Sequence, residues 1–399
     1  MSINRTYLEK LYSELPTETR EMFDKSVACI VEAKKKKGKV VTVVGSGPNI
    51  HEGVTTLIAE LIHKGIIDGV TTSSAVIAHE MAGTLDKVKR VDGRKLGFPE
   101  EILPRGNIFE VTIMSDKLLS GLKKELIIDE ELINKTLNTE GSTIIKAAGN
   151  MAYPMGFRSE VLSKEVMFIA QSKGVPFEVV AGAGADPNTM LGAGFRKGIP
   201  VLVTIPQLVG GGMVGISIAD SISINERSTK IAEMMGSADV IIESGVALTQ
   251  EIHDGPFETY TGHGVWSYWE GCKTYSLRDK TIVRFDLDPN LKKAWDMDKQ
   301  SSTVQAAIDK GLPKTKLMSI PFRMEMSGFA RLEKSLPVIG DLGVLWPIMA
   351  MQLEKKLGFE LDFMSYPQQS EDGQKMRQWI VDNIKPIDKK KLNYKVKSQ

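Results

Sequence analysis

Residues 39–53 read KVVTVVGSGPNIHEG, an apolar run that leads into a glycine-bearing loop. The run has the β-branched composition typical of a buried strand. Gly45 and Gly47 allow a tight turn or the close approach of a ligand. A helix with one apolar face is expected over 54–64, and a second strand over 66–72. Strand, glycine loop, helix and strand form a βαβ unit, which predicts a parallel sheet with helices on both faces.

The same alternation continues along the chain. Strands are expected over 176–182, 200–205, 238–244 and 281–289, and helices over 4–36, 117–138, 158–173, 225–236, 301–310, 341–357 and 371–384. The less regular stretch 91–156 is interpreted as a cover for the site or an interface, and the basic tail 385–399 as frayed. The sequence therefore predicts an α/β fold with a Rossmann-like, doubly wound and mostly parallel sheet, carrying helical N- and C-terminal extensions.

Composition excludes several classes of protein. The 399 residues hold 51 Lys and Arg against 50 Asp and Glu, so no global field attracts nucleic acid. Two cysteines, Cys29 and Cys272, are too few for a disulfide framework. We find neither an apolar stretch of membrane-spanning length nor a signal peptide. We expect a cytoplasmic protein without nucleic-acid or membrane partners, organised as an N-terminal extension (1–38), a continuous body (39–357) and a C-terminal helix with a tail (358–399).

The loop after the first strand is the first candidate ligand site. Its backbone N–H groups, at the start of a helix, can point at an anion. It lacks the full G-x-G-x-x-G pattern, because Pro48 is followed by Asn49 and Ile50. On this loop alone, nucleotide or phosphate binding and a plain tight turn are equally good interpretations. The candidate contacts are Gly45, Ser46, Gly47, Pro48, Asn49 and His51.

Two further strand ends carry polar side chains. The second strand runs into four hydroxyl residues, Thr71, Thr72, Ser73 and Ser74. Ligands of open α/β sheets lie beyond the carboxyl ends of the strands, so these two neighbouring ends would suit a diphosphate with its riboses. Asp286 and Asp288 end the strand predicted at 281–289. Such carboxylates accept hydrogen bonds from ribose hydroxyls, or alternatively cap the next helix.

The richest polar stretch of the chain is 250–273, QEIHDGPFETYTGHGVWSYWEGCK. Long loops of this kind are usually functional. It supplies acid/base candidates, and a desolvated lysine near its tryptophans can act as a nucleophile, although most lysines do not. No metal site is predicted, because histidine spacings typical of metal ligands are missing. His79 is a further candidate, with a surface pair between His79 and Glu80 as the alternative. The catalytic candidates are therefore Glu251, His253, Asp254, Lys273 and His79.

Several segments, in order, resemble the NAD-binding domain of archaeal and cyanobacterial ornithine cyclodeaminases, also known as the LOR/SDH conserved region. They are GSGP followed by H-x-G, then A-x-H-E, PFEVVAGAGADP, SADVIIE and VRFDLDP. The closing segment VIGDLGVLWPIMA is similar to the terminal T-D-V-G helix of that family and to deoxyhypusine synthase, whose NAD-binding fold is shared. The segment IHEGVTTLIAELIHKGIIDGVTTSS likewise resembles deoxyhypusine synthase. The resemblance covers about 39–357.

This resemblance implies a deoxyhypusine synthase-like fold, NAD as the cofactor and assembly as a homo-oligomer. It places NAD against the 45–53 loop, the Thr71–Ser74 strand end and four further positions, Glu80, Asp186, Gly255 beside Asp254, and Asp341. The chain also departs from the relatives. The imine-forming lysine of deoxyhypusine synthase lies in a W-G-K motif, whereas 269–273 read WEGCK. Only Arg105-Gly106-Asn107 matches the cyclodeaminase H-R-N-H stretch, and loosely.

The leading functional hypothesis is an NAD-dependent lyase, a deaminase or cyclase, that acts on a C–N bond of a small amino acid or polyamine. Bound NAD+ would take a hydride to give an imine, and a nucleophile would attack before the hydride returns. A substrate carboxylate would need Arg105 or Arg196, and a substrate ammonium would need carboxylates. One alternative is aminobutyl transfer through a Lys273 imine. The other is a non-catalytic NAD-binding regulator, which the crowded 250–273 loop disfavours.

Overall fold

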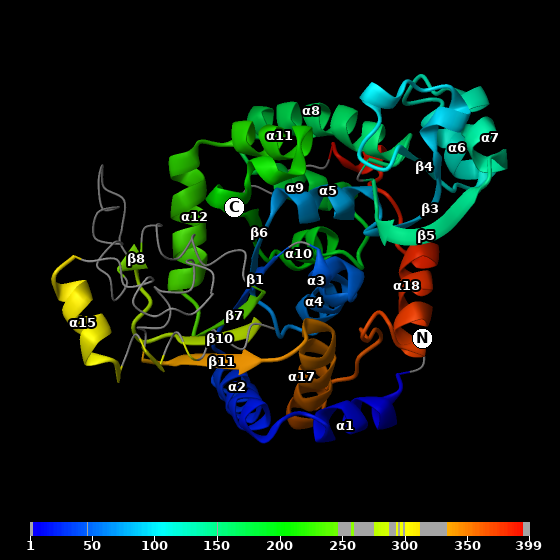
Figure 1. Cartoon of the computed structure of the whole chain (residues 1–399). Coiled ribbons are helices and arrows are strands. Elements are labelled where there is room, and N and C mark those ends of the chain that lie inside the picture. The colour runs from blue at the N-terminus through cyan, green and yellow to red at the C-terminus, as the bar shows by residue number, and fades with distance from the viewer. Residues whose placement is uncertain are drawn as a thin grey trace.

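The computed structural model describes residues 3–45, 47–149, 151–245, 257–258, 275–286, 293, 296–297, 300–311 and 333–393. At its centre lies a six-stranded, all-parallel sheet in the order β11-β10-β7-β1-β2-β6 (Figure 1). These strands are β1 (Val40–Val44), β2 (Gly69–Thr72), β6 (Val201–Val203), β7 (Val240–Ser244), β10 (Thr281–Asp286) and β11 (Ser335–Ile339). The predicted α/β, mostly parallel sheet is confirmed.

The strand order reverses between β1 and β7. From β1 the chain moves outward through β2 to β6, then returns across β1 to build β7, β10 and β11 on the other side. The two strands at this switch point are in register from Val40 opposite Val240 to Val44 opposite Ser244. Their carboxyl ends therefore stop side by side. In doubly wound sheets the crevice for a ligand opens at this point.

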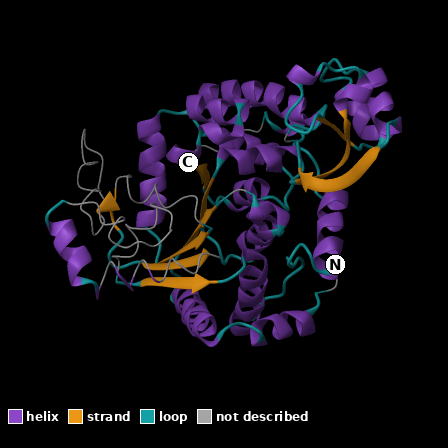
Figure 2. Ribbon diagram, in the orientation of Figure 1, coloured by secondary structure: helices purple, strands orange, loops and turns teal. Residues whose placement is uncertain are grey.

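Alternate side chains of the strands pack into cores on the two faces of the sheet. On one face Val41, Val43 and Ile241 pack against α12 (Ile224–Gly236). On the other face Val40, Val44, Val240 and Ile242 join the larger core, which the helices α2 (Thr17–Lys35), α4 (Val54–His63) and α17 (Leu342–Leu357) help to form. This is the period-2 burial of a strand covered on both sides. Figure 2 shows helices on both sides of the sheet.

A helical layer surrounds the ends of β2 and β6. It comprises α5 (Ser74–Ala82), α8 (Met155–Lys173), α9 (Phe177–Gly184), α10 (Met190–Lys197) and α11 (Met213–Ser221). The strand predicted over 176–182 is wrong, because this run forms the buried helix α9. A short apolar run does not by itself distinguish a buried strand from a buried helix. The small residue Gly182 lets α9 approach α10 closely, since an added Cβ would lie 2.7 Å from the Leu191 carbonyl oxygen.

The stretch that looked irregular in sequence contains a second, antiparallel sheet in the order β4-β3-β5. Its strands are β3 (Leu85–Asp92), β4 (Ile108–Thr112) and β5 (Gly141–Ala147). The helix predicted over 117–138 is two helices, α6 (Asp116–Leu122) and α7 (Glu130–Asn138). Likewise, the helix predicted over 4–36 is split into α1 (Arg5–Ser13) and α2, because Pro16 between them cannot continue a helix.

The C-terminal segment packs on the body after α18 (Glu371–Asn383). Ile387 and Leu392 are buried, and the N–H groups of Ile387 and Asp388 donate to the carbonyls of Met81 and Gly184, both at 2.9 Å. The prediction that 385–399 is frayed is therefore wrong for 385–393, whereas 394–399 lie outside the described residues.

Short elements complete the fold. They are α3 (Pro48–His51), α15 (Ser302–Asp309), the paired strands β8 (Phe257–Glu258) and β9 (Tyr275–Ser276), and the 3₁₀ turns η1 (Gly93–Leu96), η2 (Glu100–Ile102), η3 (Ile205–Gln207), η4 (Val209–Gly211) and η8 (Lys389–Lys391). Among the described helices none combines the length and apolarity that crossing a bilayer requires. The division at 38 and 357 stays a prediction.

Candidate functional site at the switch point

The turn after β1 is open to a ligand at Gly47. This glycine has φ +68° and precedes α3, which is a single turn with Pro48 at its first position. A Cβ added at Gly47 would meet nothing within 4 Å, so the side of this residue where a side chain would lie is open. Gly53, with φ +69°, then separates α3 from α4. A Cβ at Gly53 would lie 2.5 Å from Met376 Sδ, because α18 packs against this break.

Asn49 joins the β1 turn to the end of β7. Its side chain is 1% exposed. Its Nδ2 donates to the carbonyls of Gly45 at 3.1 Å and Ser244 at 3.2 Å, and its Oδ1 accepts from Ser244 Oγ at 2.5 Å. Trp346 Nε1 donates to the same hydroxyl at 2.7 Å, and the Gly45 N–H donates to the Ser244 carbonyl. Sequence reasoning assigned Asn49 to the cofactor, whereas in the structure its amide donates to, and its oxygen accepts from, groups of the protein itself.

The hydroxyls at the end of β2 differ in their partners. Thr72 Oγ1 donates to the Val44 carbonyl at 3.0 Å, and Ser73 Oγ caps α5 by accepting from the Val76 N–H at 3.3 Å. Thr71 is buried, and its hydroxyl has no hydrogen-bond partner among the described residues. The same holds for Thr204, directly after β6. Buried hydroxyls normally have a partner, so these two atoms fit a polar ligand or an ordered water.

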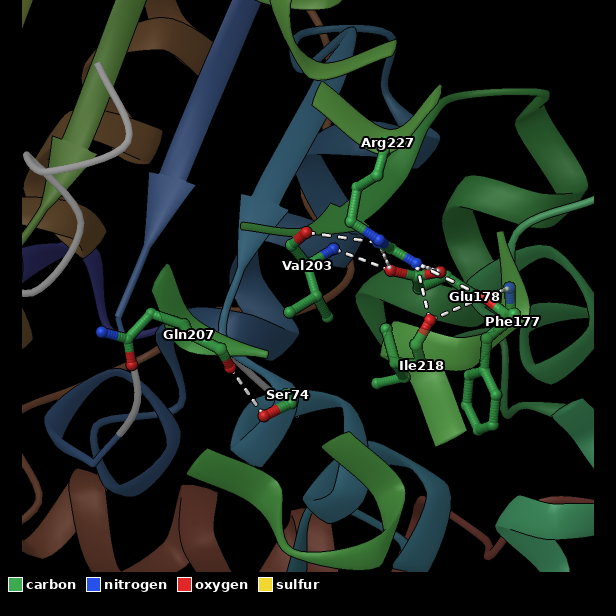
Figure 3. A network of polar contacts seen from close by, with 8 residues as sticks. Ser74, Phe177, Glu178, Val203, Gln207, Ile218 and Arg227 are labelled. Atoms are coloured by element: carbon green, nitrogen blue, oxygen red, sulfur yellow. Dashed lines mark hydrogen bonds and ion pairs between the residues drawn. The ribbon is translucent and has the colours of Figure 1, made fainter. Parts of the chain in front are cut away.

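Ser74 ties the start of α5 to the 3₁₀ turns that follow β6. Its hydroxyl donates to the Gln207 carbonyl at 2.7 Å (Figure 3) and accepts from the Gly211 N–H at 2.8 Å. The glycines of η4 lie close to α5, because a Cβ added at Gly211 would lie 2.8 Å from the Ser74 backbone. The glycine-rich stretch after β6 is therefore packed against the end of β2.

A buried ion pair holds the neighbouring edge of the sheet. The Arg227 guanidinium lies 2.5 Å from the Glu178 carboxylate, and the two side chains are 0% and 1% exposed (Figure 3). Glu178 accepts the Val203 N–H at 2.8 Å, and Arg227 donates to the Val203 carbonyl at 3.2 Å. β6 is the last strand in the described sheet order, so the two side chains satisfy the backbone groups on its outer edge.

Glu80 and Asp186 use their carboxylates within the protein. Glu80, 1% exposed, accepts the N–H groups of Met190 and Leu191, each at 2.9 Å, and so caps α10. Burial raises the pKa of Glu80 to about 7. Asp186 accepts the N–H groups of Asn188 at 2.9 Å and Lys385 at 3.1 Å. The alternative of a surface His79–Glu80 pair is wrong. The cofactor contacts assigned to Glu80 and Asp186 stay predictions.

Asp341 and Glu52 lie where β11 leads into α17. Asp341 caps α17 by accepting the Gly343 N–H at 2.9 Å. Glu52, which sequence reasoning did not single out, is 4% exposed and accepts the Gln368 N–H at 2.6 Å. Burial raises the pKa of Glu52, and the negative charge of Asp341 adds to the shift. The cofactor contact assigned to Asp341 stays a prediction.

Sequence reasoning named His51 and His79, but not the charged side chains that gather with them at the end of β5. We call the whole group the β5 cluster: His51, His79, Asp86, Lys146 and Arg377. Arg377 Nη2 lies 3.5 Å from His51 Nδ1 and donates to the Ile145 carbonyl at 2.5 Å. His79 Nδ1 lies 2.8 Å from the Ala148 carbonyl oxygen. Its members come from five separate elements, α3, α5, β3, β5 and α18, so no local motif reveals it.

The β5 cluster has shifted ionisation equilibria. Burial lowers the pKa of His51, and the positive charge of Arg377 and the nearby His79 and Lys146 lower it further. Burial also lowers the pKa of His79. Burial raises the pKa of Asp86 to about 6, against the opposing effect of the Gly149 N–H that it accepts. The shifts of both histidines favour the neutral form of the imidazole.

Much of the predicted site lies outside the described residues. This applies to Ser46, Glu251, His253, Asp254, Gly255, Lys273 and Asp288, and to the side chain of Asp286. Their roles stay predictions. Within the described residues, no group of three or more His, Cys, Asp or Glu side chains is arranged to hold a metal ion. Arg196 donates to the carbonyls of Gly192 and Ala185, whereas Arg105 is exposed.

Comparisons with known proteins identify distant structural similarities. No family model and no curated protein matches the sequence. The apo structure of ArgZ, an arginine dihydrolase from the ornithine–ammonia cycle in cyanobacteria, has a TM-score of 0.40 and 12% identity over 86% of this chain and 32% of its own. A putative LOR/SDH protein from Methanococcus maripaludis has a TM-score of 0.40 and 14% identity over 86% of this chain and 71% of its own. The ternary complex of AgrE with ornithine and NAD+ has a TM-score of 0.39 and 12% identity over 86% of this chain and 34% of its own.

The chain thus spans about a third of the length of ArgZ and AgrE. The LOR/SDH group that the sequence motifs resemble is also represented among these structures.

Proposed function

We propose that the protein is an NAD-dependent enzyme that acts on a C–N bond of a small amino acid or polyamine. The observation that supports this most is the strand order, with a glycine turn beside the switch point between β1 and β7. Dinucleotides bind at this crevice in sheets of the same order. The sequence motifs that resemble the ornithine cyclodeaminase domain supply the class of substrate.

The described residues at the crevice fit a dinucleotide. The turn at Gly47 would receive the diphosphate, because an added Cβ there would meet nothing within 4 Å and the space beside it is open. The buried hydroxyls of Thr71 and Thr204, without partners among the described residues, would bind polar groups of the cofactor. Asn49 would hold the turn in place through Gly45 and Ser244. When bound, NAD+ supplies a hydride acceptor for the carbon of the substrate's C–N bond.

The protein itself must accept a proton from the substrate amine. A protonated amine has no lone pair to form an imine, so a base beside the substrate is required. Burial lowers the pKa of His79 and of His51, which favours the neutral form of each imidazole. A neutral imidazole has a ring nitrogen with a lone pair that can accept a proton. The acids and the histidine predicted within 250–273 would act with them.

The test begins with the purified chain. We expect denaturation to release NAD, detected by absorbance and mass, or NAD to bind in solution at micromolar concentration. The NAD-loaded protein is then given ornithine, related amino acids and polyamines, and products are analysed by mass. Turnover of one of these compounds supports the proposal. NAD binding without turnover of any of them indicates a regulator, and failure to bind NAD at millimolar concentration contradicts the proposal.

A further inference from the structure

The β5 cluster places opposite charges at the two ends of a short backbone segment. At one end Arg377, from α18, donates to the Ile145 carbonyl. At the other end Asp86, from β3, accepts the Gly149 N–H at 3.1 Å. Lys146 lies between them in sequence, with its Nζ 2.5 Å from the Glu110 carboxylate. The segment therefore carries a guanidinium at one end and a carboxylate at the other.

The charged group at each end of this segment has hydrogen-bonding atoms without a partner among the described residues. The Nε of Arg377 is buried and has no partner among the described residues. Asp86 accepts through Oδ2 alone in the part of the chain that the structure describes. A buried donor without a partner costs stability unless a ligand or water satisfies it. A carboxylate held by one N–H can still accept further donors.

The cluster adjoins the proposed cofactor crevice. His51 is the last residue of α3, which follows the β1 turn, and His79 lies on α5, which follows β2. Arg377 reaches His51, and His79 reaches the Ala148 carbonyl beside Gly149. The cluster and the crevice thus share the helices α3 and α5. A molecule held here would lie on the side of α3 and α5 that faces β5.

We propose that the β5 cluster binds the two charged ends of an amino-acid substrate, with Arg377 holding the carboxylate and Asp86 the ammonium group. This inference rests on the proposed function, because it names the substrate site of that enzyme. The planar fork of arginine matches a carboxylate. Asp86 lies opposite Lys146 in the antiparallel β3–β5 pair, one residue along β5 from Ile145, so the two charged groups border the same part of this strand.

The test uses two probes that differ in one group. L-Ornithine carries a carboxylate and two amines, and 1,4-diaminobutane is the same molecule without the carboxylate. Binding of each to the full chain with NAD is measured by calorimetry. For Arg377→Met we expect ornithine affinity to fall by about tenfold to a hundredfold, the range for losing a hydrogen bond to a charged group, with the diamine unaffected. For Asp86→Asn we expect both probes to bind more weakly.

Two further variants make the result interpretable. Arg94→Met removes an exposed guanidinium beside β3, paired with Asp92 at 2.7 Å, and is expected to leave both affinities unchanged. Arg377→Lys keeps the positive charge but lacks the planar fork of the guanidinium. It is expected to retain part of the ornithine affinity, and it replaces Arg377→Met if that variant is unstable. Equal loss of both probes in Arg377→Met, or no loss of ornithine, contradicts the inference. So does a wild-type chain that binds neither probe at millimolar concentration.

NAD binding is measured in parallel on every variant. A chain that binds NAD normally but shows no dependence on Arg377 rejects the substrate site and leaves the proposed function standing. A wild-type chain that does not bind NAD rejects the proposed function instead.

Discussion

Asn49 Oδ1 accepts a hydrogen bond from the Ser244 hydroxyl at 2.5 Å, across the point where the strand order reverses. The amide group of the same side chain donates to the carbonyls of Gly45 and Ser244. One buried side chain thus fixes the turn after β1 relative to the end of β7. Because both sides of the crevice meet at this residue, its hydrogen bonds determine the shape of the proposed cofactor site.

Replacing Asn49 with alanine is expected to lower the free energy of unfolding by about 3 kcal/mol. Three hydrogen bonds are lost, and each contributes about 1 kcal/mol in a buried site. We also expect NAD to bind more weakly, because the turn loses its anchor. Denaturant unfolding measures the first effect, with Asn383→Ala as the control. Among the described residues Asn383 donates only to the Trp379 carbonyl, at an exposed site, so its loss is expected to cost less than about 0.5 kcal/mol.

Removal of the guanidinium in Arg227→Ala is expected to destabilise the protein by about 3–5 kcal/mol. It leaves the Glu178 carboxylate buried without its partner. The double variant Glu178→Leu with Arg227→Met is expected to be more stable than Arg227→Ala, because no isolated charge remains. Lys230→Ala, on the exposed face of the same helix, is the matched control. Similar destabilisation by Arg227→Ala and by the control Lys230→Ala would contradict the role of the ion pair at the outer edge of β6.

The unfolding free energy is expected to fall in acid partly because of His51. Burial lowers the pKa of His51 below that of the unfolded chain, which is about 6.5. The unfolded state therefore binds a proton as the pH falls below about 6.5, whereas the folded state does so only at lower pH. His51→Gln removes this difference. Between about pH 7 and pH 5 the variant should lose less stability than the wild type, and parallel losses would contradict this assignment.

The strand pattern made the central sheet predictable. β-branched runs ending in glycine or hydroxyl residues located β1, β2 and β7, and their order along the chain predicted parallel pairing. The apolar run at 176–182 was misread as a strand, because it is buried on all sides and periodicity alone cannot assign it. The second sheet was missed, because β3 reads LDKVKRVD, in which charged residues interrupt the apolar positions.

The candidate site was predictable only in part. The turn at 45–49 follows from a local glycine pattern, and the structure places it at the switch point. Pairing of Asn49 with Ser244 joins residues 195 positions apart, and Arg377 lies 326 positions from His51. Such contacts depend on packing between distant elements, which no local pattern in the sequence records. The same is true of Glu80, whose partners belong to α10.

Titration of NAD into two glycine variants tests the central claim most directly. Gly47 and Gly65 have φ values of +68° and +72°, and a Cβ at either would meet nothing within 4 Å. Alanine is therefore expected to cost similar stability at both, about 1 kcal/mol, but only Gly47 lies at the carboxyl end of β1. We predict at least about tenfold weaker NAD binding for Gly47→Ala and wild-type binding for Gly65→Ala. Equal NAD affinities in the two variants, or a wild-type chain that binds no NAD, would contradict a dinucleotide site at the β1 turn.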